Sequence, residues 1–402
     1  MKKNLYLFTM EYPYGKGGTF VHNEVAFLAA AFHKVYIIPE QIPESSEVSL
    51  LPNNVEILHL NITESRTRRN WIIFSNMPLL FELIFQEIFF SRQKKGIWEN
   101  RKKIFFMLIS LLYKKKALKT ILQKEDSSVF YSYWFSNYAT LLGILKRNGI
   151  IPSFISRAHG FDLYEDNGKY NYIPFRYFQL KQVKKIYCVS EKGANYLKGI
   201  YPQFKEKIFC NHLGVSDYGS NPFSKECTLT IVTCSNIIPV KRVHLMVEIL
   251  SLVKKDVKWI HFGEGYLKQE MMEKVKALPI NIVAEFRGYV SIERLMEFYK
   301  SNPVSLFINT SISEGLPVSI QEAISFGIPI MATDAGGTSE IVNDKTGILL
   351  PLYFDVKEAA KQIDDFSSSF RNTEEFRWGV KAFWNQYYNA QNNYPKFVQQ
   401  LL

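Results

Sequence analysis

Residues 304–342 read VSLFINTSISEGLPVSIQEAISFGIPIMATDAGGTSEIV and contain the most informative pattern in the chain. An apolar strand leads into a loop, a helix, a second apolar strand and a Gly-Gly turn. Pro317 suits the first turn of the helix, where a missing N–H group costs nothing, and Gly327 suits the position just past its end. The pattern predicts a strand–helix–strand crossover in a parallel sheet.

The start of this helix combines an anion-binding backbone with two carboxylates. The N–H groups of residues 315–319 can bind an anion, helped by the positive end of the helix dipole. Glu314 precedes the helix, and Glu322 lies eight positions further on, inside it. Carboxylates beside an anion site indicate a ligand that carries both phosphate and hydroxyl groups, as a sugar nucleotide does.

Other motifs follow one another in order along the chain: GGTFVHNE (17–24), RAHGFDLY (157–164), SNIIPVKR (235–242), FGEGYLKQE (262–270), FRGYV (286–290) and EGLPVSIQE (314–322). With these motifs the sequence resembles, over nearly its whole length, the retaining glycosyltransferases of group 1 (family 4). It is similar to those that build bacterial surface polysaccharides. The resemblance implies the GT-B fold, in which two doubly wound, Rossmann-like α/β domains face a cleft. The alternative for residues 304–342 alone is an ordinary α/β crossover with surface glutamates.

The chain has 402 residues, enough for two domains of ordinary size. Apolar runs that alternate with helical patterns predict two parallel sheets, with strands at 5–9, 35–39, 55–60, 129–133, 154–157 and 186–189, then at 229–234, 257–262, 282–286, 304–309 and 328–332. We expect an N-terminal acceptor-binding domain over 1–215 and a C-terminal nucleotide-sugar-binding domain over 216–385. By resemblance, 386–402 is a terminal helix that packs back on the N-terminal domain.

Composition indicates a protein of the cytoplasm. The four cysteines show no C-x-x-C spacing, so reduced thiols are expected and a disulfide framework is not. The first apolar run is too short for a signal peptide and is interrupted by Glu11, which favours a first strand. No membrane span is predicted, because 71–90 contains Glu82 and Glu87, and 104–113 is about half as long as a span.

Positive charge is concentrated in one segment. The whole chain has a net charge of +11, and residues 66–124 alone hold 14 Lys or Arg and 3 Glu, which also gives +11. Basic clusters beside aromatic and aliphatic helices suit contact between a peripheral protein and an anionic membrane. Buried helices with solvated basic ends explain the pattern equally well. A nucleic-acid surface is a third interpretation, but no nucleic-acid-binding motif accompanies the charge.

A leaving diphosphate must be stabilised by a metal or by fixed donors and cations. No two of the ten Asp residues are separated by a single residue, so a D-x-D metal pair is absent. We therefore expect a metal-independent enzyme with no cofactor, in which Lys241 contacts phosphate. The family commonly has Arg five positions before this Lys, where this chain has Asn236. Arg242 is the candidate for the second charge.

Further roles are implied by the resemblance. Glu322 accepts hydrogen bonds from the ribose hydroxyls, which suits a carboxylate with two acceptor oxygens. Glu314 lies near the transferred sugar, where it holds hydroxyls or stabilises positive charge at the anomeric carbon. His159 faces the donor sugar from the N-terminal domain. Asp162 orients the His159 loop or meets the acceptor.

The other donor-binding residues implied by the resemblance act mainly through backbone close to the nucleotide sugar: Gly17, Gly18, Gly263, Gly265, Tyr289, Gly315, Leu316, Pro317 and Val318. The implied activity is that of a hexosyltransferase-type glycosyltransferase. It moves a sugar from an NDP-sugar, with UDP favoured over GDP, to a saccharide acceptor. The acceptor is expected to be lipid-linked, in capsule, exopolysaccharide or lipopolysaccharide biosynthesis, with the protein peripheral on the inner face of the plasma membrane. A sugar-nucleotide epimerase or hydrolase of the same fold, and a non-catalytic lipid or polyanion binder, are the alternatives.

Overall fold

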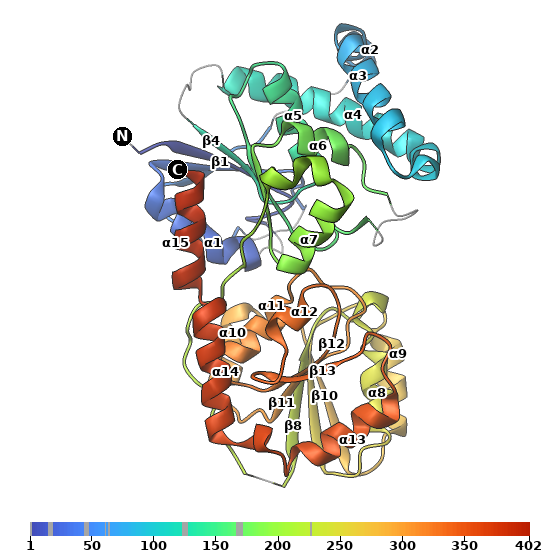
Figure 1. Ribbon diagram of the computed structural model, residues 1–402, viewed down its shortest axis with the longest axis vertical. Coiled ribbons are helices and arrows are strands. Elements are labelled where there is room, and N and C mark those ends of the chain that lie inside the picture. Colours follow the sequence, from blue (N-terminus) through green and yellow to red (C-terminus); the bar gives the residue numbers. More distant parts are fainter. Residues whose placement is uncertain are drawn as a thin grey trace. The chain divides into compact units, whose positions relative to one another are not determined.

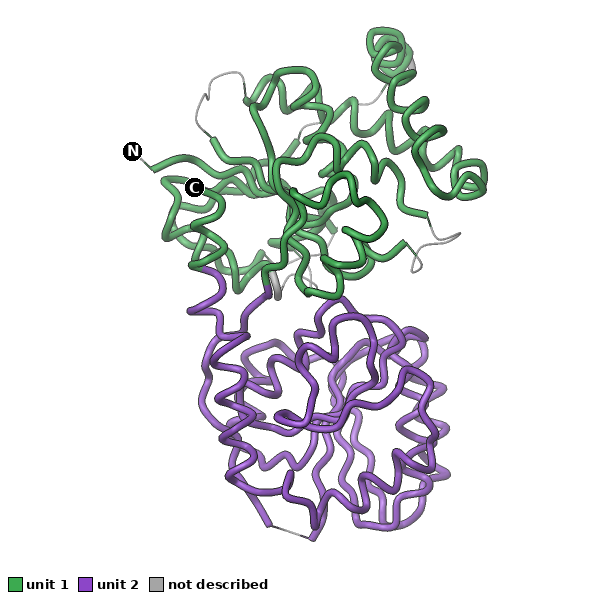
Figure 2. Tube along the Cα trace, in the orientation of Figure 1, with its two compact units in different colours: residues 1–211, 395–402 green, residues 212–394 purple. Residues whose placement is uncertain are grey.

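The structure is a computed structural model that describes residues 2–14, 19–43, 48–60, 62, 65–122, 128–165, 172–225 and 227–402. It divides into two compact units, each with its own parallel sheet (Figures 1 and 2). Unit 1 comprises Met1–Asn211 and Pro395–Leu402, and unit 2 comprises His212–Tyr394. The sequence predicts this boundary at residue 215 and the start of the returning segment at residue 386. The units are described separately below.

The sheet of unit 1 has seven strands in the order β3-β2-β1-β4-β5-β6-β7, all parallel. The strands are β1 (Asn4–Thr9), β2 (Lys34–Pro39), β3 (Val55–Ile57), β4 (Val129–Ser132), β5 (Ile155–Ala158), β6 (Lys185–Cys188) and β7 (Ile208–Cys210). The order reverses between β1 and β4, which makes their carboxyl ends a topological switch point. Ligands of open α/β sheets bind at such points.

Alternate side chains of β1 pack into different cores on the two faces of this sheet. Leu5 and Leu7 lie in one core with α1 (Thr19–Ala31), while Tyr6 and Phe8 lie in the other with α5 (Asn137–Arg147). The second core also includes residues of α6 (Arg176–Gln182) and α7 (Glu191–Ile200). Unit 1 is therefore a doubly wound, three-layered domain, as predicted.

Residues 66–122 form α2 (Arg66–Ser75), α3 (Met77–Phe90) and α4 (Lys94–Leu122) (Figure 1). Two arrangements were equally compatible with the sequence of this basic apolar segment: helices buried in the core, and helices with an exposed apolar surface. The structure combines both. Its inner side belongs to the core, where Leu83 and Leu108 are buried. Its outer side carries large apolar side chains that contact solvent.

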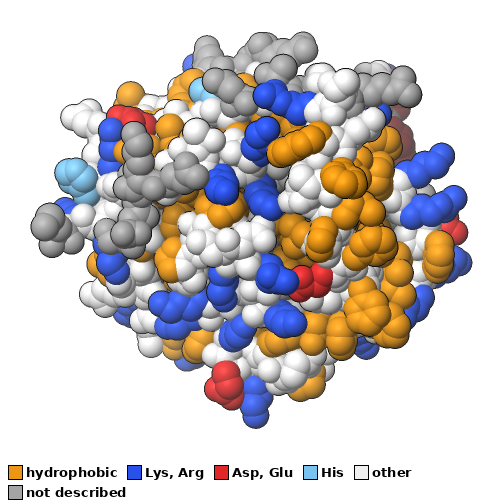
Figure 3. Space-filling view, turned by 90° about the horizontal axis from the view of Figure 1, so that it is seen from above, with side chains coloured by type: hydrophobic (Ala, Val, Ile, Leu, Met, Phe, Trp, Pro, Cys, Tyr) orange, Lys and Arg blue, Asp and Glu red, His pale blue; other side chains and the backbone are white. Residues whose placement is uncertain are grey.

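The outer side of α3 is an apolar stripe. Its members recur at the spacing of one helical face and are between 41% and 66% exposed: Phe81, Ile84, Phe85, Ile88 and Phe89. Basic side chains are exposed along the same helices: Arg68, Arg69, Arg92, Lys94, Lys95, Arg101, Lys102, Lys103, Lys116 and Lys119. Among the side chains described between 65 and 122, the only exposed acidic one is Glu99. We call this combination the α2–α4 surface; Figure 3 shows apolar and basic side chains side by side there.

Over the described ranges, no single helix is long and apolar enough to cross a membrane. Residues 67–75 and 77–90 pass that test together, by length and composition, but they are bent by 69°. The break follows from the residues between them. The side chain of Asn76 donates to the carbonyl of Ile72 (2.9 Å) and caps α2, and Pro78 brings no N–H group to the start of α3.

A buried carboxyl fastens α3 to the rest of unit 1. Glu87 accepts hydrogen bonds from the Tyr172 hydroxyl (2.8 Å) and the Phe175 N–H (3.0 Å), just before α6. Burial raises the pKa of Glu87 to about 7, against the lowering effect of these two donors. The stripe on α3 is thus held to the core by polar contacts as well as by apolar packing.

The sheet of unit 2 has six parallel strands in the order β10-β9-β8-β11-β12-β13. They are β8 (Leu229–Cys234), β9 (Val257–Phe262), β10 (Ile282–Gly288), β11 (Leu306–Asn309), β12 (Ile330–Thr333) and β13 (Gly347–Leu350). Numbered within the unit, the order is the 3-2-1-4-5-6 of a Rossmann sheet. The predicted strands of both units are present, whereas the short strands β7 and β13 were not predicted.

Helices of unit 2 lie between these strands or, for the last two, after β13: α8 (His244–Leu250), α9 (Lys268–Lys274), α10 (Ile292–Ser301), α11 (Val318–Ser325), α12 (Thr338–Ile341), α13 (Val356–Phe366) and α14 (Glu374–Tyr387). A short 3-10 helix, Pro239–Lys241, precedes α8. The crossover predicted from residues 304–342 is β11–α11–β12. Its two strands are neighbours in the sheet, between β8 and β13.

The last helix, α15 (Ala390–Leu401), crosses the division between the units at Pro395. Beyond that proline, Phe397, Val398 and Leu401 are buried in the core that contains α1. The Arg157 guanidinium lies 3.9 Å from the centre of the Phe397 ring. The last residues of the chain are therefore part of unit 1.

Candidate functional site

The central site of unit 2 is built on α11, whose two ends are fixed by local sequence. Pro317 is the N-cap residue, one position before the first helical turn predicted for it. Gly327 has φ of 79°, its N–H donates to Ile324, and the N–H of Ile328 donates to Ala323. This is a Schellman motif, which needs a left-handed residue at the glycine position.

Open N–H groups surround the N-terminus of α11. In the described part of the chain, the N–H groups of Gly315, Leu316, Val318 and Ser319 donate no hydrogen bond. The side chains of Leu316 and Val318 are buried, so these two residues offer their backbone rather than their side chains. An anion placed here would receive several N–H donors and the positive end of the helix dipole.

A glycine turn after β12 supports this loop. Gly336 has φ of 55°, and a Cβ atom at that position would lie 1.8 Å from the carbonyl oxygen of Glu314. The N–H of Gly337 donates to the Gly315 carbonyl over 2.9 Å. Gly336 is thus required by the close backbone contact between this turn and the loop before α11.

Glu322 lies inside α11 and is 7% exposed. Burial raises the pKa of its carboxyl to about 8. Among the described residues, no group donates a hydrogen bond to this carboxyl. A buried carboxyl without donors is costly unless a ligand supplies them, and a vicinal diol offers two hydroxyl donors.

Glu314 and Lys241 form a close ion pair. Lys241 Nζ lies 2.6 Å from Glu314 Oε1, and the Asn309 side-chain amide donates to the same oxygen over 3.3 Å. Both side chains are mostly buried, which strengthens a pair compared with one in water. The structure therefore brings together the residues predicted for the phosphate and for the transferred sugar. The charges of Glu322 and Lys241 both influence the Cys234 thiol, which places all of these groups near the end of β8.

Arg242 makes contacts that the sequence did not predict. Its backbone is left-handed, with φ of 47°, and its guanidinium donates to the carbonyls of Thr310 (2.7 Å) and Ser311 (3.2 Å). These contacts hold the loop after β11. Contact between Arg242 and phosphate stays a prediction. Asn236 is exposed, so its position could accommodate a longer side chain.

Two glycines close the other side of this site. A Cβ at Gly263, which has φ of 144°, would lie 1.9 Å from the Ser235 carbonyl oxygen, and one at Gly265 would lie 2.2 Å from the Ile237 carbonyl oxygen. The loop after β9 therefore packs backbone to backbone against the loop after β8. Tyr289 follows β10 and is half exposed.

His159 lies in unit 1, directly after β5, and is 8% exposed. Its ring packs on Tyr133 and Trp134, with ring centres 4.9 Å and 4.2 Å apart. Burial lowers the pKa of His159, an effect that nearby Asp162 opposes. The nearest Asp162 oxygen is 3.6 Å from Nδ1, longer than a hydrogen bond. A neutral imidazole that can donate and accept hydrogen bonds suits contact with sugar hydroxyls.

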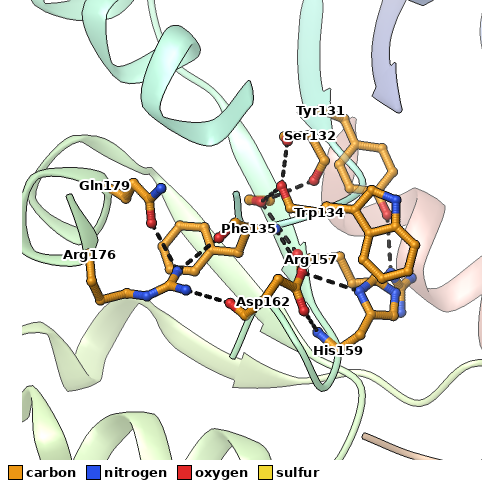
Figure 4. A network of polar contacts seen from close by, with 10 residues as sticks. Tyr131, Ser132, Trp134, Phe135, Arg157, His159, Asp162, Arg176 and Gln179 are labelled. Carbon is orange, nitrogen blue, oxygen red and sulfur yellow. Dashed lines mark hydrogen bonds and ion pairs between the residues drawn. The ribbon is translucent and has the colours of Figure 1, made fainter. Parts of the chain in front are cut away.

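Asp162 organises the loop around His159 (Figure 4). Its carboxylate accepts the N–H groups of His159 (2.7 Å) and Phe135 (2.8 Å). Arg176 in turn donates to the carbonyls of Asp162 and Phe135. Of the two roles expected for Asp162, these contacts supply the orientation of the loop.

A buried ion pair that the sequence did not indicate joins two of the motifs. Arg157, which begins RAHGFDLY, lies 3.1 Å from Glu24, which ends GGTFVHNE, and both side chains are fully buried. Arg157 also donates to the Tyr131 hydroxyl (3.0 Å) and to the Asn211 carbonyl (2.9 Å). The pair fixes β5 against α1, and thereby the position of His159, which directly follows β5.

Trp134 and Phe161 form an aromatic surface beside His159. Their ring centres are 4.9 Å apart, and Phe161 is 53% exposed. No spacing in the sequence relates Trp134 to His159, because they follow different strands, β4 and β5, that become neighbours only in the sheet. Exposed aromatic faces of this kind suit the apolar face of a sugar ring.

Two predictions lie beyond these observations. Gly17 and Gly18 fall outside the described residues. Within the described residues no group of three His, Cys, Asp or Glu side chains could hold a metal ion, and independence from metal stays a prediction.

Comparison with known proteins relates this geometry to a family. Residues 221–377 match the family model described as glycosyl transferases group 1. One subunit of the human phosphatidylinositol N-acetylglucosaminyltransferase is 25% identical over 323 residues, 79% of this chain and 58% of that protein. The O-antigen biosynthesis glycosyltransferase WbnH of Escherichia coli is 26% identical over 183 residues, 42% of this chain and 51% of that protein. The chain thus spans less than two thirds of the length of the curated relatives it matches.

A solved structure extends the likeness to the whole chain. The crystal structure of Anabaena Alr3699/HepE in complex with UDP-glucose has a TM-score of 0.68 and 14% identity, and covers 99% of both chains. At this identity the likeness establishes the fold, and the predicted fold is confirmed. Residues 221–377 form a glycosyltransferase group 1 domain, and the chain has the GT-B fold.

Proposed function

We propose that the protein is a retaining glycosyltransferase that moves a hexose from a UDP-sugar to a saccharide acceptor without a metal ion. The observation that carries the proposal is the N-terminus of α11. Its open N–H groups directly follow Glu314, which pairs with Lys241, and no described residue donates a hydrogen bond to the Glu322 carboxyl inside the helix. UDP is favoured because the solved relative described above is a complex with UDP-glucose.

Each part of the donor has a proposed partner. The four open N–H groups at the start of α11 receive the diphosphate, with Lys241 as the cation. Glu322 accepts hydrogen bonds from the ribose diol. Glu314 and the neutral His159 contact the hexose. Donor binding then draws Lys241 from Glu314 towards phosphate, so that Glu314 is released to face the sugar.

The proposed reaction needs no separate base. The acceptor hydroxyl attacks the anomeric carbon on the face from which the nucleotide departs. The bond between that carbon and the diphosphate oxygen breaks, and the departing oxygen takes the proton of the acceptor hydroxyl. The products are UDP and a glycoside with the original anomeric configuration. Negative charge that develops on the diphosphate is stabilised by fixed N–H groups and Lys241.

The test of donor binding is thermal unfolding with UDP, GDP, ADP and CDP, each in EDTA and in magnesium. A ligand that binds only the folded state raises the melting temperature. We expect UDP to do so equally in both conditions. Stabilisation only with magnesium would overturn metal independence. No stabilisation by any nucleotide would instead favour the non-catalytic binder.

Turnover separates transfer from the other enzymatic alternative. UDP-sugar consumption by the protein should increase when an acceptor is added. Consumption at the same rate with and without acceptor would favour an epimerase or hydrolase.

We further propose that the acceptor is lipid-linked, at an anionic membrane on the cytoplasmic side, in bacterial surface polysaccharide biosynthesis. The α2–α4 surface supports this. Ten exposed basic side chains flank exposed aromatic residues there, and Glu99 is the only exposed acidic residue among the side chains described between 65 and 122. Aromatic and aliphatic side chains enter the headgroup region, while basic ones attract anionic lipids. The two named relatives act in O-antigen biosynthesis and on phosphatidylinositol, by their names.

Flotation with anionic liposomes tests the membrane contact. Suitable changes are Phe81→Ser, Phe85→Ser and Phe89→Ser together, or Arg92→Glu, Lys95→Glu and Lys102→Glu together. Lys114 and Lys115 are unsuitable, because Lys114 pairs with Glu40 (3.2 Å) and Lys115 donates to Asn76 (2.7 Å). The matched control is Lys345→Glu, Lys357→Glu and Lys361→Glu, all exposed and in unit 2. Equal flotation of all variants, or none by the unchanged protein, would overturn the proposal.

A further inference from the structure

Unit 1 contains a cavity of about 680 Å³ that neither the motifs nor the donor site explain. It lies between α4 and the segments that follow β2 and β4, at the carboxyl edge of the sheet. Its lining includes Glu40, Lys103, Phe106, Ser110, Asn137 and Tyr172. A volume of this size is in the range of small-molecule sites.

One end of the cavity is polar and offers unused groups. Glu40 Oε1 accepts hydrogen bonds from Asn137 Nδ2 (3.0 Å) and Lys114 Nζ (3.2 Å). Its other oxygen, Oε2, accepts none from the described residues, and the carbonyl of the Asn137 side chain receives none either. These oxygens can accept hydroxyl groups of a ligand.

A cation on α4, one helical turn before Phe106, also lines the cavity. Lys103 is exposed and forms no ion pair with any described residue, although it lines the cavity with Glu40. Two helical turns separate it from Ser110, which also lines the cavity. A ligand with hydroxyl groups and a phosphate would find acceptors for the former and a cation for the latter.

Apolar side chains of α4 line the cavity as well, and one of them leads outward. Ile104, Met107 and Leu111 contribute apolar side chains from α4, and Phe106 lines the cavity while remaining 62% exposed. Phe105, its neighbour, is 46% exposed. The cavity thus opens on the α2–α4 surface, where apolar and basic side chains are already gathered (Figure 3). A hydrocarbon chain could leave the cavity along the exposed ring of Phe106.

The cavity also adjoins the part of unit 1 that holds His159. Asn137 begins α5 only three positions after Trp134, whose ring packs on His159. Both residues follow β4, at the carboxyl edge of the sheet. The part of a ligand that contacts Asn137 would therefore lie at the same edge of the sheet as the aromatic surface of Trp134 and Phe161.

We propose that this cavity binds the acceptor through its phosphate-bearing head, with the hydrocarbon chain directed along Phe106 to the membrane. This inference rests on the proposed function and deepens it. The ligand class is an amphiphile in which a phosphodiester joins a sugar to a long alkyl or isoprenoid chain. Lys103 contacts the phosphate, and Glu40 and Asn137 accept sugar hydroxyls. No residue of the proposed donor site is needed for this binding.

The experiment uses the full chain and a synthetic probe, glucose 1-(decyl phosphate), below its micelle concentration. Its dissociation constant is measured by calorimetry for the unchanged protein, Lys103→Gln and Ser110→Trp. Loss of one charge-assisted contact should weaken binding about tenfold in Lys103→Gln. Ser110→Trp should fill the cavity and abolish detectable binding. Lys119→Gln, an exposed lysine of α4 that does not line the cavity, should bind as the unchanged protein does.

Partial ligands and UDP complete the test. Glucose 1-phosphate and decyl phosphate should each bind more weakly than the joined probe, because each fills one end only. UDP binding should be unchanged in the cavity variants.

If UDP binds but Lys103→Gln and Ser110→Trp retain full affinity for the probe, the cavity inference is wrong while the donor proposal stands. If decyl phosphate binds as well as the probe, the cavity holds a membrane lipid and not the acceptor head. Absence of UDP binding in the unchanged protein would remove the proposed function itself.

Discussion

Around its centre, each sheet runs in the same order: β3-β2-β1-β4-β5-β6 in unit 1 corresponds to β10-β9-β8-β11-β12-β13 in unit 2. The segments that follow the strands differ. In unit 2, Gly263, Gly265 and Gly336 bring backbone against backbone, and α11 presents N–H groups. In unit 1, the corresponding edge carries aromatic rings, buried ion pairs and the inserted helices α2–α4.

The difference follows from what the two edges bind under the proposed function. A nucleoside diphosphate is the same in every turnover, and backbone N–H groups can receive it with little dependence on side chains. An acceptor is particular to one enzyme, so side chains and insertions must recognise it. The predictions below test this division of roles, from the largest expected effect to the smallest.

The sharpest test is Glu314→Ala. If Glu314 stabilises positive charge at the anomeric carbon, turnover should fall about 100-fold, while the dissociation constant for UDP changes little. Steady-state kinetics and calorimetry measure the two quantities. Glu270→Ala, which removes an exposed partner of Lys274, is the control. A fall in UDP affinity as large as the fall in turnover would place Glu314 in nucleotide binding instead.

Glu322→Ala should act on nucleotide affinity. Removal of the ribose acceptor should weaken UDP binding about tenfold. His159→Ala in unit 1 should leave the affinity for UDP unchanged and reduce turnover of the UDP-sugar, because UDP lacks the hexose. Equal loss of UDP affinity in both variants would break the assignment of the nucleotide to unit 2.

The pH dependence of UDP binding tests the same carboxyl. Burial raises the pKa of Glu322 to about 8, so the ligand-free carboxyl is mostly protonated at pH 7. Ribose hydroxyls donate to the ionised form, so affinity should rise with pH. With this pKa, the ionised fraction grows about fivefold between pH 7 and pH 8. Calorimetry at both values measures the change.

Two glutamine variants make this test specific. Glu322→Gln should remove the pH dependence. Glu87→Gln, which changes the carboxyl of unit 1 whose pKa burial raises to about 7, should leave it intact. Loss of the dependence in Glu87→Gln would show that it reports on folding of unit 1 and not on the nucleotide.

The smallest expected effect is a gain. Asn236 is exposed and precedes Lys241 by five positions, where the family pattern has Arg. Asn236→Arg should add a partly screened contact to the diphosphate and tighten UDP binding about threefold. Asn236→Gln is the uncharged control. Unchanged affinity in Asn236→Arg at low salt would mean that the diphosphate lies away from this loop.

Sequence patterns predicted unit 2 better than unit 1, for a physical reason. The β11–α11–β12 crossover is specified by neighbours in sequence: Pro317 begins the helix, Gly327 ends it, and Gly336 permits the close turn. Such local requirements place Pro and Gly at fixed positions, where they can be recognised in the sequence. The short strand β13 was missed because four residues, Gly347–Leu350, carry too little pattern to be distinguished from a loop.

The residues of unit 1 depend on contacts between distant segments. Glu24 and Arg157 are far apart in sequence, and Trp134 meets His159 through the pairing of β4 with β5. The direction of the Arg242 side chain could not be predicted either, because it is set by the carbonyls of Thr310 and Ser311. For the α2–α4 segment, composition left burial and exposure equally open. Only the fold shows which face of each helix is buried and which is exposed.

The returning end of the chain has a consequence for synthesis. Phe397, Val398 and Leu401 complete the core around α1, yet they leave the ribosome after all of unit 2. Domains usually fold in order of their synthesis. Here unit 2 has its whole sequence available first, while unit 1 waits with part of its interior open to water. A chain stalled or cut before Pro395 would therefore release a finished second unit joined to an incomplete first one, which is a substrate for chaperones and proteases.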